Sequence, residues 1–298
     1  MVSVLLPAYK AKYLAESIRS VLSQTYNDLE LIIVNDKSPE DLTSIVESFN
    51  DSRIRYYINK ENIGSKDLVA NWNYCLSLAQ GEYFCLICDD DIYEPTFVEE
   101  MLSLAQLYPE CNVFRSGVSI INKKGDVYDH YPSSPSWESS EDYIWHVLRG
   151  YRCQTITEWF YRRAPIVQQG GFVSFPLAWY SDFMSIFKFS TEGGIASTTK
   201  RLVTFRMSGD NITSKHNIHT FKKMEAACRF EDEVINLILS NKYDKKILTL
   251  LLKKYMIKKK TYELGTCSLS DMFRLFRGRK KYGLSFMMFV KSLKIRLQ

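Results

Sequence analysis

Three consecutive carboxylates, Asp89, Asp90 and Asp91, follow an apolar stretch typical of a buried strand, in the segment YFCLICDDDIYEP. Two carboxylates about 6 Å apart repel each other by roughly 3 kcal/mol at an effective dielectric constant near 20. A single capping side chain satisfies the free amides of the helix expected from Pro95, so a plain acidic turn does not require three acids. Mg²⁺ and Mn²⁺ bind one or two carboxylates together with substrate phosphates. The triplet therefore favours a metal–diphosphate site over a solvated turn.

The elements around the triplet alternate between strands and helices. Apolar stretches predict strands at residues 2–7, where the first strand stops at Pro7, and at residues 29–36, 53–59 and 82–88. Helices are expected between these strands and after the last one, and Ser38 with Pro39 is typical of a helix start. This order predicts an α/β fold with a mostly parallel central sheet and helices on both faces. Ligands of such sheets bind beyond the carboxyl ends of the strands, where Tyr9, Asp36 and the triplet fall.

The rest of the chain divides into a less regular part and a helical part. A strand and hairpin are predicted over residues 112–131, and a helix is predicted to begin near Asp182. We predict a nucleotide-binding half at residues 1–110 and an acceptor half at 111–218. Residues 219–298 are predicted to form a basic helical C-terminal region.

The composition is that of a soluble globular protein, with 46% apolar and 24% charged residues. Seven cysteines without a framework-like spacing favour reduced thiols and a cytoplasmic location. Cys85 and Cys88 would point to opposite faces of a strand, so they are interpreted as buried strand residues and not as metal ligands. We expect neither a signal peptide nor a membrane-spanning helix.

The C-terminal region concentrates the positive charge. Residues 242–298 hold 16 Lys or Arg and 3 Asp or Glu, within a chain whose net charge is +5. Basic residues interleaved with Phe, Met and Leu are typical of helices at a membrane surface, which predicts peripheral contact with the inner face of the cell membrane. A helical cap with solvated lysines is the alternative. Nucleic acid is not expected as a partner, because no recognised binding module accompanies the charge.

Four segments, in this order and spacing, resemble the family 2 inverting glycosyltransferases of the GT-A fold, which use nucleotide-sugar donors. The segments are VSVLLPAY, SIRSVLSQTYNDLELIIVND, ENIGSKDLVANWNYCLSLAQGEY and CDDDIYEPTF. They cover residues 2–100 closely, and single positions match as far as about residue 215. The resemblance implies a GT-A fold, a UDP-sugar donor and a Mn²⁺ or Mg²⁺ cofactor.

The resemblance also implies roles at the first two strand ends. Pro7, Ala8 and Tyr9 match the segment along the nucleotide base, where an aromatic ring can stack on uracil; Tyr9 could instead close the edge of the core. Asp36 matches the aspartate that accepts the N3–H of the base, and an ionised acceptor makes the stronger hydrogen bond. Asp36 could also act as an anion at the N-terminus of the helix starting at Ser38.

Other matches concern the diphosphate and the metal. Lys66 corresponds to a basic residue near the diphosphate, or it is a solvated loop lysine. Asn71 and Asn73 are interpreted as structural residues that bind loop backbone. The triplet departs from the common D-x-D-D pattern.

Cys88 occupies the position of the first acid in that pattern. The implied assignment places Asp89 on the ribose and Asp90 on the metal, with Asp91 beside it as a further metal residue. Strand alternation would instead pair Asp89 with Asp91, so the direct ligand stays open.

Inverting transfer needs a base for the acceptor hydroxyl, and Asp182 in LAWYSDF matches the family's catalytic base at the head of a helix. The alternative is that Ser181 or Asp182 only caps this helix. Glu158 is the reserve candidate for the base. His216 corresponds to a loop that closes over the diphosphate, sometimes with a metal-binding His. Arg206 could pair with phosphate or with an acid of the fold.

We therefore predict a metal-dependent inverting transferase that moves a hexose or N-acetylhexosamine from a UDP-sugar to a saccharide or lipid-linked acceptor. Bacterial surface polysaccharide synthesis is the expected setting. A nucleotidyltransferase is the first alternative, although no Gly- and basic-rich phosphate loop occurs near residue 10. The second alternative is a non-catalytic sugar-nucleotide-binding protein of the same fold.

Overall fold

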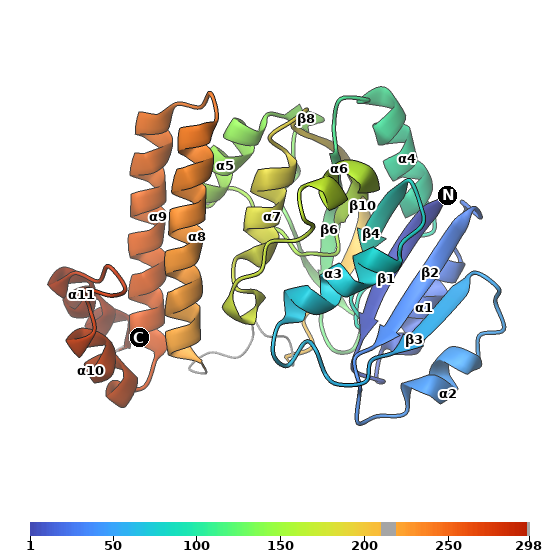
Figure 1. The fold of residues 1–298 in the computed structure, drawn as a ribbon, viewed down its shortest axis with the longest axis horizontal. Coiled ribbons are helices and arrows are strands. Elements are labelled where there is room, and N and C mark those ends of the chain that lie inside the picture. The colour runs from blue at the N-terminus through green and yellow to red at the C-terminus, as the bar shows by residue number, and fades with distance from the viewer. Residues whose placement is uncertain (210–218, 297–298) are drawn as a thin grey trace.

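The computed structural model describes residues 1–209 and 219–296. Figure 1 shows a twisted central sheet with helices on its faces and two long helices packed beside it. Within the described residues the sheet has ten strands in the order β3-β2-β1-β4-β9-β6-β10-β5, with β7 paired to β6 and β8 to β10. The strands are β1 (Val2–Ala8), β2 (Leu29–Asn35), β3 (Ile54–Ile58), β4 (Tyr83–Leu86), β5 (Ile92–Tyr93), β6 (Val113–Ile121), β7 (Val127–His130), β8 (Trp137–Glu138), β9 (Trp159–Arg162) and β10 (Ile195–Arg206).

The first four strands form the parallel part of the sheet, as their alternation with helices predicts. Every residue of β2 is buried, which is typical of a strand covered on both faces. The helices are α1 (Leu14–Leu22), α2 (Leu42–Glu47), α3 (Leu68–Leu78), α4 (Phe97–Leu107), α5 (Ser140–Arg149), α6 (Arg163–Gln168), α7 (Ser181–Phe189), α8 (Thr220–Ser240), α9 (Lys245–Thr266), α10 (Leu269–Arg277) and α11 (Phe286–Arg296). The predicted α/β class with a helical C-terminal extension is confirmed.

Helix α2 begins later than the sequence predicts. Its N-cap is Asp41, whose carboxylate accepts a hydrogen bond of 3.1 Å from the Ser44 amide. The hydroxyl of Ser38 instead donates to the carbonyl oxygen of Tyr9 at 2.6 Å. The predicted helix start at Ser38 is therefore wrong, because Ser38 ties the loop after β2 to the end of β1. Asp36 consequently does not stand at the N-terminus of a helix.

Strand β9 interrupts the parallel part of the sheet. It lies between β4 and β6 and runs antiparallel to both, with Phe160 paired to Cys85 on one side and Phe114 on the other. Strands β6 and β10 are again parallel, while β5 pairs antiparallel with β10. Because β9 sits beside β4, the chain immediately before β9 lies next to the end of β4, where the acidic triplet begins.

The C-terminal helices α8 and α9 share the main apolar core with the sheet. Phe230 and Val234 of α8 and Leu252 of α9 belong to the same buried cluster as Leu5 of β1 and Phe187 of α7. The helices α10 and α11 pack on a smaller, separate cluster. The long helices therefore support the sheet directly, and α10 and α11 form an outer unit (Figure 1).

Candidate active site

Asp89 fastens the end of β4 to the end of β1. One oxygen of its carboxylate accepts the backbone amides of Tyr9 and Lys10, at 2.8 and 2.7 Å. Burial raises the pKa of Asp89, and these two amides act in the opposite direction. The amide of Asp36 donates to the carbonyl of Ala8 at 2.9 Å. The predicted meeting of Tyr9, Asp36 and the triplet at one edge of the sheet is thus observed.

Asp90 and Asp91 are adjacent in the chain but differ in their surroundings. Asp91 is fully buried, and its two oxygens accept the Thr157 hydroxyl at 2.5 Å and the Arg206 amide at 3.0 Å. Asp90 accepts a hydrogen bond of 3.2 Å from the Ser208 hydroxyl, through one oxygen. Burial and the charge of Asp90 raise the pKa of Asp91 to about 7, and burial also raises the pKa of Asp90.

Arg206 fixes the triplet from β10. Its Nε donates to the carbonyl of Asp90 at 3.0 Å, and its guanidinium forms an ion pair of 2.6 Å with Glu16. The guanidinium also lies 4.2 Å from the centre of the Tyr13 ring. Of the two roles left open by the sequence, the structure shows pairing with an acid of the fold. The Arg206 side chain therefore holds the turn of the acidic triplet by binding the backbone carbonyl of Asp90.

Asp36 holds the loop after β3. Its carboxylate accepts the side-chain amide of Asn59 at 2.7 Å and the backbone amides of Ile63 and Gly64 at 2.8 and 2.7 Å. An ideal Cβ on Gly64 would come within 2.7 Å of this carboxylate, so the close approach requires glycine. Asp36 is 4% exposed and lies beside the end of β1.

The remaining residues predicted on the nucleotide side differ in exposure. Pro7 and Ala8 lie in β1, paired with Val34 and Asn35 of β2. The Tyr9 side chain is 41% exposed, so it does not close the core edge, and its ring is accessible at the strand end. Lys66 is an exposed loop residue that forms a surface ion pair of 2.6 Å with Glu61. His216 lies outside the described residues.

Of the two asparagines predicted to be structural, Asn73 binds loop backbone as expected. It exchanges two hydrogen bonds with the backbone of Phe172, at 2.9 and 2.8 Å. Asn71 accepts instead from the side chain of Asn59 at 3.1 Å. Cys85 is buried in β4, and the half-buried Cys88 has its pKa raised by burial.

Asp182 lies in the first turn of α7, behind a strained turn. Leu177, Ala178 and Tyr180 have φ angles of 63°, 55° and 67°, which non-glycine residues rarely adopt. The Tyr180 ring stacks on Phe230 of α8 with ring centres 4.8 Å apart. The N-cap of α7 is Tyr180, so neither Ser181 nor Asp182 caps this helix. The Ser181 hydroxyl instead accepts the Phe175 amide at 3.0 Å. Strained residues of this kind persist where the surrounding structure fixes them, often at functional sites.

Burial raises the pKa of Asp182 to about 6, while the Phe183 amide and the Gln154 side chain act to lower it. The charge of Asp182 in turn contributes to the raised pKa of Tyr255 on α9. A half-buried carboxylate with a pKa near neutrality is suited to general base catalysis. Asp182 therefore has the electrostatic properties of the predicted base.

Residues 153–158, which we term the bridging segment, connect the triplet with Asp182. Thr157 binds Asp91 at one end. At the other end Gln154 lies near enough to lower the pKa of Asp182, although its side-chain nitrogen makes no hydrogen bond within the described residues. Three residues of extended chain span at most about 10 Å. One short stretch of chain therefore contacts the acidic triplet at Thr157 and approaches Asp182 at Gln154.

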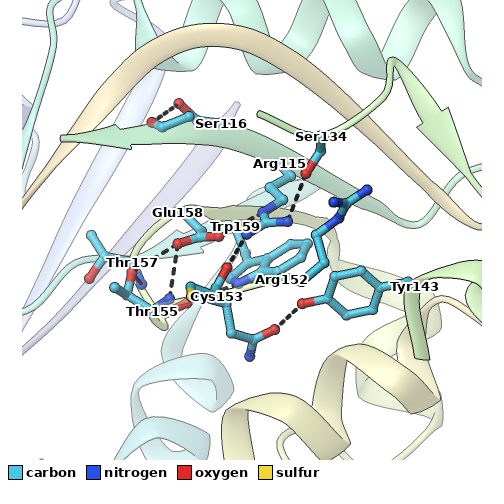
Figure 2. A network of polar contacts seen from close by, with 12 residues as sticks. Arg115, Ser116, Ser134, Tyr143, Arg152, Cys153, Thr155, Thr157, Glu158 and Trp159 are labelled. Atoms are coloured by element: carbon cyan, nitrogen blue, oxygen red, sulfur yellow. Dashed lines mark hydrogen bonds and ion pairs between the residues drawn. The ribbon is translucent and has the colours of Figure 1, made fainter. Parts of the chain in front are cut away.

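Figure 2 shows the polar network that holds the bridging segment. Arg115 of β6 donates to Glu158 at 2.7 Å and also to the carbonyl of Cys153. Glu158 further accepts the Thr155 amide at 2.9 Å and is fully buried. Tyr143 donates to the side-chain oxygen of Gln154. The reserve base candidate Glu158 is therefore committed to an ion pair that fixes this segment.

No cluster of three or more His, Cys, Asp or Glu side chains arranged to hold a metal occurs in residues 1–209 and 219–296. The same part of the chain contains no helix that is long and apolar enough to cross a membrane. A divalent ion at the triplet would accordingly need oxygens from the substrate as well as from the protein.

Comparison with known proteins shows the family. The family model described as glycosyl transferase family 2 matches residues 3–166, which is more than half of the chain. The chain belongs to glycosyl transferase family 2. An uncharacterized glycosyltransferase of Haemophilus influenzae is 26% identical over 253 residues, which cover 80% of this chain and 75% of that protein. One of Rickettsia conorii is 36% identical over 130 residues, which cover 42% of this chain and 21% of that protein.

Two solved structures share the fold. Staphylococcus aureus TarS 1–349 in complex with UDP-GlcNAc has a TM-score of 0.69 at 16% identity, covering 88% of this chain and 72% of that chain. The mannosyltransferase PcManGT from Pyrobaculum calidifontis, in complex with GDP-Man and Mn²⁺, has a TM-score of 0.58 at 17% identity, covering 99% and 86%. These likenesses confirm the predicted GT-A fold of this family 2 glycosyltransferase.

Sequence reasoning missed several residues that build this glycosyltransferase site. Thr157 and Ser208 bind the acids of the triplet, and Gln154 lies near enough to Asp182 to lower its pKa. Thr157 and Ser208 lie 66 and 118 residues from the acids that they bind. No local pattern could identify them, because the position of β9 brings Thr157 to the triplet and the end of β10 brings Ser208 there.

Proposed function

We propose that the chain is a metal-dependent inverting glycosyltransferase that moves a hexose or N-acetylhexosamine from a UDP-sugar to a hydroxyl of a saccharide or lipid-linked saccharide. The observation that carries the proposal is the bridging segment, because this short stretch of chain contacts the acidic triplet through Thr157 and approaches Asp182 through Gln154. The solved structures of the same fold, one with UDP-GlcNAc and one with GDP-Man and Mn²⁺, add support.

The triplet offers oxygen donors suited to Mn²⁺ or Mg²⁺. Asp90 has a hydrogen bond to one oxygen within the described residues, whereas both oxygens of Asp91 are engaged. This geometry favours Asp90 over Asp91 as the ligand, with Asp91 holding the turn. A bound divalent ion would supply positive charge to the leaving diphosphate. His216 stays a prediction for the same ion.

The nucleotide would lie along the end of β1. The exposed Tyr9 ring is placed to stack on a base. The backbone amide of Asp36 binds Ala8 at the same strand end, and its carboxylate, which already accepts three donors, would accept the imide N–H through a remaining lone pair. Asp89 joins Tyr9 to the end of β4 and would approach the ribose. Lys66 would have to leave its surface partner Glu61 to reach the diphosphate.

Asp182 would act as the general base. Its carboxylate takes the proton of the acceptor hydroxyl as the oxygen attacks the anomeric carbon, from the face opposite to the leaving UDP. The bond to the diphosphate oxygen breaks as the new glycosidic bond forms, which inverts the configuration. A base with a pKa near 6 is largely ionised at neutral pH and still accepts a proton effectively.

The similar proteins of Haemophilus influenzae and Rickettsia conorii are bacterial, which supports a place in bacterial surface polysaccharide synthesis. The basic C-terminal region would bring the enzyme to the inner face of the cell membrane, where a lipid-linked acceptor is presented.

Product analysis with UDP-hexoses and UDP-N-acetylhexosamines tests this proposal. A glycosyltransferase releases UDP, whereas a nucleotidyltransferase releases pyrophosphate. Calorimetry of UDP with Mn²⁺ should show binding by the parent and a loss of at least about tenfold in affinity for Asp90→Asn. Asp126→Asn, in the exposed hairpin turn, is the matched control and should bind like the parent. Tight UDP binding without any sugar transfer would indicate a non-catalytic protein instead.

A further inference from the structure

The helices α10 and α11 form an outer unit that is seated firmly on α8 and α9. Its inner side contributes to a small buried cluster that includes Leu275 of α10 and Phe289 of α11. At the crossing of α11 with α9, an ideal Cβ on Gly265 would lie 2.7 Å from Ile295, so the close approach depends on glycine. The inner faces of α10 and α11 are thus fully used in packing.

The outer side of this unit is also apolar. On α11, Phe286, Val290 and Leu293 recur at the i, i+4, i+7 spacing of one helix face and are 65%, 41% and 47% exposed. On α10, Leu269 and Phe273 are 64% and 58% exposed. A ring contact of 6.3 Å between Phe276 and Phe286 joins the two helices near these stripes. A helix that is apolar on opposite sides normally has both sides covered.

Positive charge borders this apolar surface. Lys291 and Lys294 follow Met287 in the adjacent stripe of α11, and the Arg277 guanidinium lies 4.6 Å from the centre of the Phe273 ring. Residues 267–296 contain eight Lys or Arg and a single acid, Asp271. We name the exposed apolar side chains together with these cations the α10–α11 face.

We propose that the α10–α11 face lies on the surface of an anionic lipid bilayer, with Phe286, Val290 and Leu293 entering the headgroup boundary. Basic residues next to exposed Phe, Met and Leu match an interface that is apolar below and negatively charged above. A second copy of the chain fits less well, because two faces with the same excess of cations would repel each other.

This inference extends the membrane contact included in the proposed function, but it does not depend on catalysis. In Figure 1, α10 lies at the same, lower end of the view as α2, which directly follows the carboxyl end of β2.

Flotation of the full chain with vesicles tests the proposal. Vesicles with about one third phosphatidylglycerol should bind the parent, and pure phosphatidylcholine vesicles should bind it much more weakly. The triple variant Phe286→Ser, Val290→Ser, Leu293→Ser should lose at least about tenfold in affinity for the anionic vesicles. In the double variant Lys291→Gln, Lys294→Gln, the affinity for the anionic vesicles should fall about fivefold for each lysine removed, and this loss should be smaller at high salt.

Matched controls replace equally exposed groups elsewhere. Leu107→Ser, Val127→Ser and Val167→Ser remove apolar side chains that are 69%, 55% and 47% exposed, and Lys245→Gln, Lys246→Gln removes two exposed charges. Both controls should bind vesicles like the parent, and all variants should melt cooperatively. Equal vesicle binding by the triple variant and the parent would overturn the proposal. The proposal would also be overturned if the parent did not bind vesicles but dimerised with increasing concentration, and the triple variant did not dimerise. UDP binding is measured in parallel, so a failure here remains distinct from a failure of the proposed function.

Discussion

The two ends of the bridging segment surround a buried carboxylate in different ways. At the Thr157 end, Asp91 and Glu158 each accept hydrogen bonds from two or more donors, and Glu158 is paired with Arg115. At the Gln154 end, Asp182 stands in the first turn of α7 and is half-buried, and no cation in the described part of the chain contributes to the shift of its pKa. Burial raises the pKa of all three acids.

The difference shows that burial alone does not identify a catalytic acid. A buried carboxylate held by several donors fixes the backbone around it, and removing it leaves those donors unsatisfied. A carboxylate with few donors and some access to solvent can exchange a proton with a substrate. The comparison therefore supports structural roles for Asp91 and Glu158 and agrees with the general-base role proposed for Asp182, and each role can be tested separately.

The largest effect is expected from Asp182→Asn. Loss of a general base should lower the rate of sugar transfer by about 10²- to 10⁴-fold, while UDP affinity and the free energy of unfolding stay close to those of the parent. Steady-state kinetics and calorimetry measure these quantities. Asp142→Asn, which also changes an acid in the first turn of a helix, is the control and should transfer normally. Near-normal transfer by Asp182→Asn would remove this residue from the mechanism.

Glu158→Gln should have the opposite signature. The substitution leaves the buried Arg115 charge unpaired, so the free energy of unfolding should fall by about 3 kcal/mol in urea titrations. Transfer per folded molecule should largely survive, because Glu158 is not the base. Glu138→Gln breaks the longer ion pair with Arg152, at 3.3 Å, and should lower the free energy of unfolding by less than Glu158→Gln does. A Glu158→Gln protein of unchanged stability but no activity would reverse the two roles.

Thr157→Val tests how the bridging segment holds the triplet. Valine keeps the shape of threonine but removes the hydroxyl that donates to Asp91 at 2.5 Å. We expect a loss of about 1–3 kcal/mol in the free energy of unfolding, together with weaker UDP binding in Mn²⁺. The control Thr43→Val removes a half-buried hydrogen bond to Tyr56 and should have a smaller effect on stability. Unchanged stability and UDP affinity would show that Thr157 does not organise the acids.

The sequence predicted correctly that the strand ends at Tyr9, Asp36 and Asp89 meet at one edge of the sheet, and the physical reason is local. Parallel strands end at one edge, so residues directly after them, such as Tyr9, Asp36 and Asp89, must meet there. The family resemblance supplied Asp182 through a matching position. The start of α2 was wrong because the Ser38 hydroxyl binds Tyr9, a contact between residues 29 positions apart.

The bridging segment could not be predicted in the same way. Its position follows from β9, which inserts antiparallel between β4 and β6, and no periodic pattern records that insertion. The partners of the triplet, Thr157, Arg206 and Ser208, lie far away in the chain. The sharing of one core by α8, α9 and the sheet likewise depends on tertiary packing, for example of Phe230 on Tyr180.

The smallest expected effect is on the pH dependence of transfer. Because burial raises the pKa of Asp182 to about 6, the carboxylate should be protonated and inactive as a base below that pH. The rate constant for transfer at saturating substrate should therefore rise with pH and level off above about pH 7. Gln154 lowers this pKa, so Gln154→Leu should move the midpoint to higher pH and reduce the rate near pH 6 most.

The control for this shift is Gln169→Leu, a change of the same type at the C-terminus of α6. It should leave the midpoint where the parent has it. Plateau rates for Gln154→Leu should approach those of the parent, because the ionised base remains in place at high pH. A midpoint that does not respond to Gln154 would mean that another group controls the profile. The partial exposure of Asp182 and its raised pKa would then not explain its reactivity.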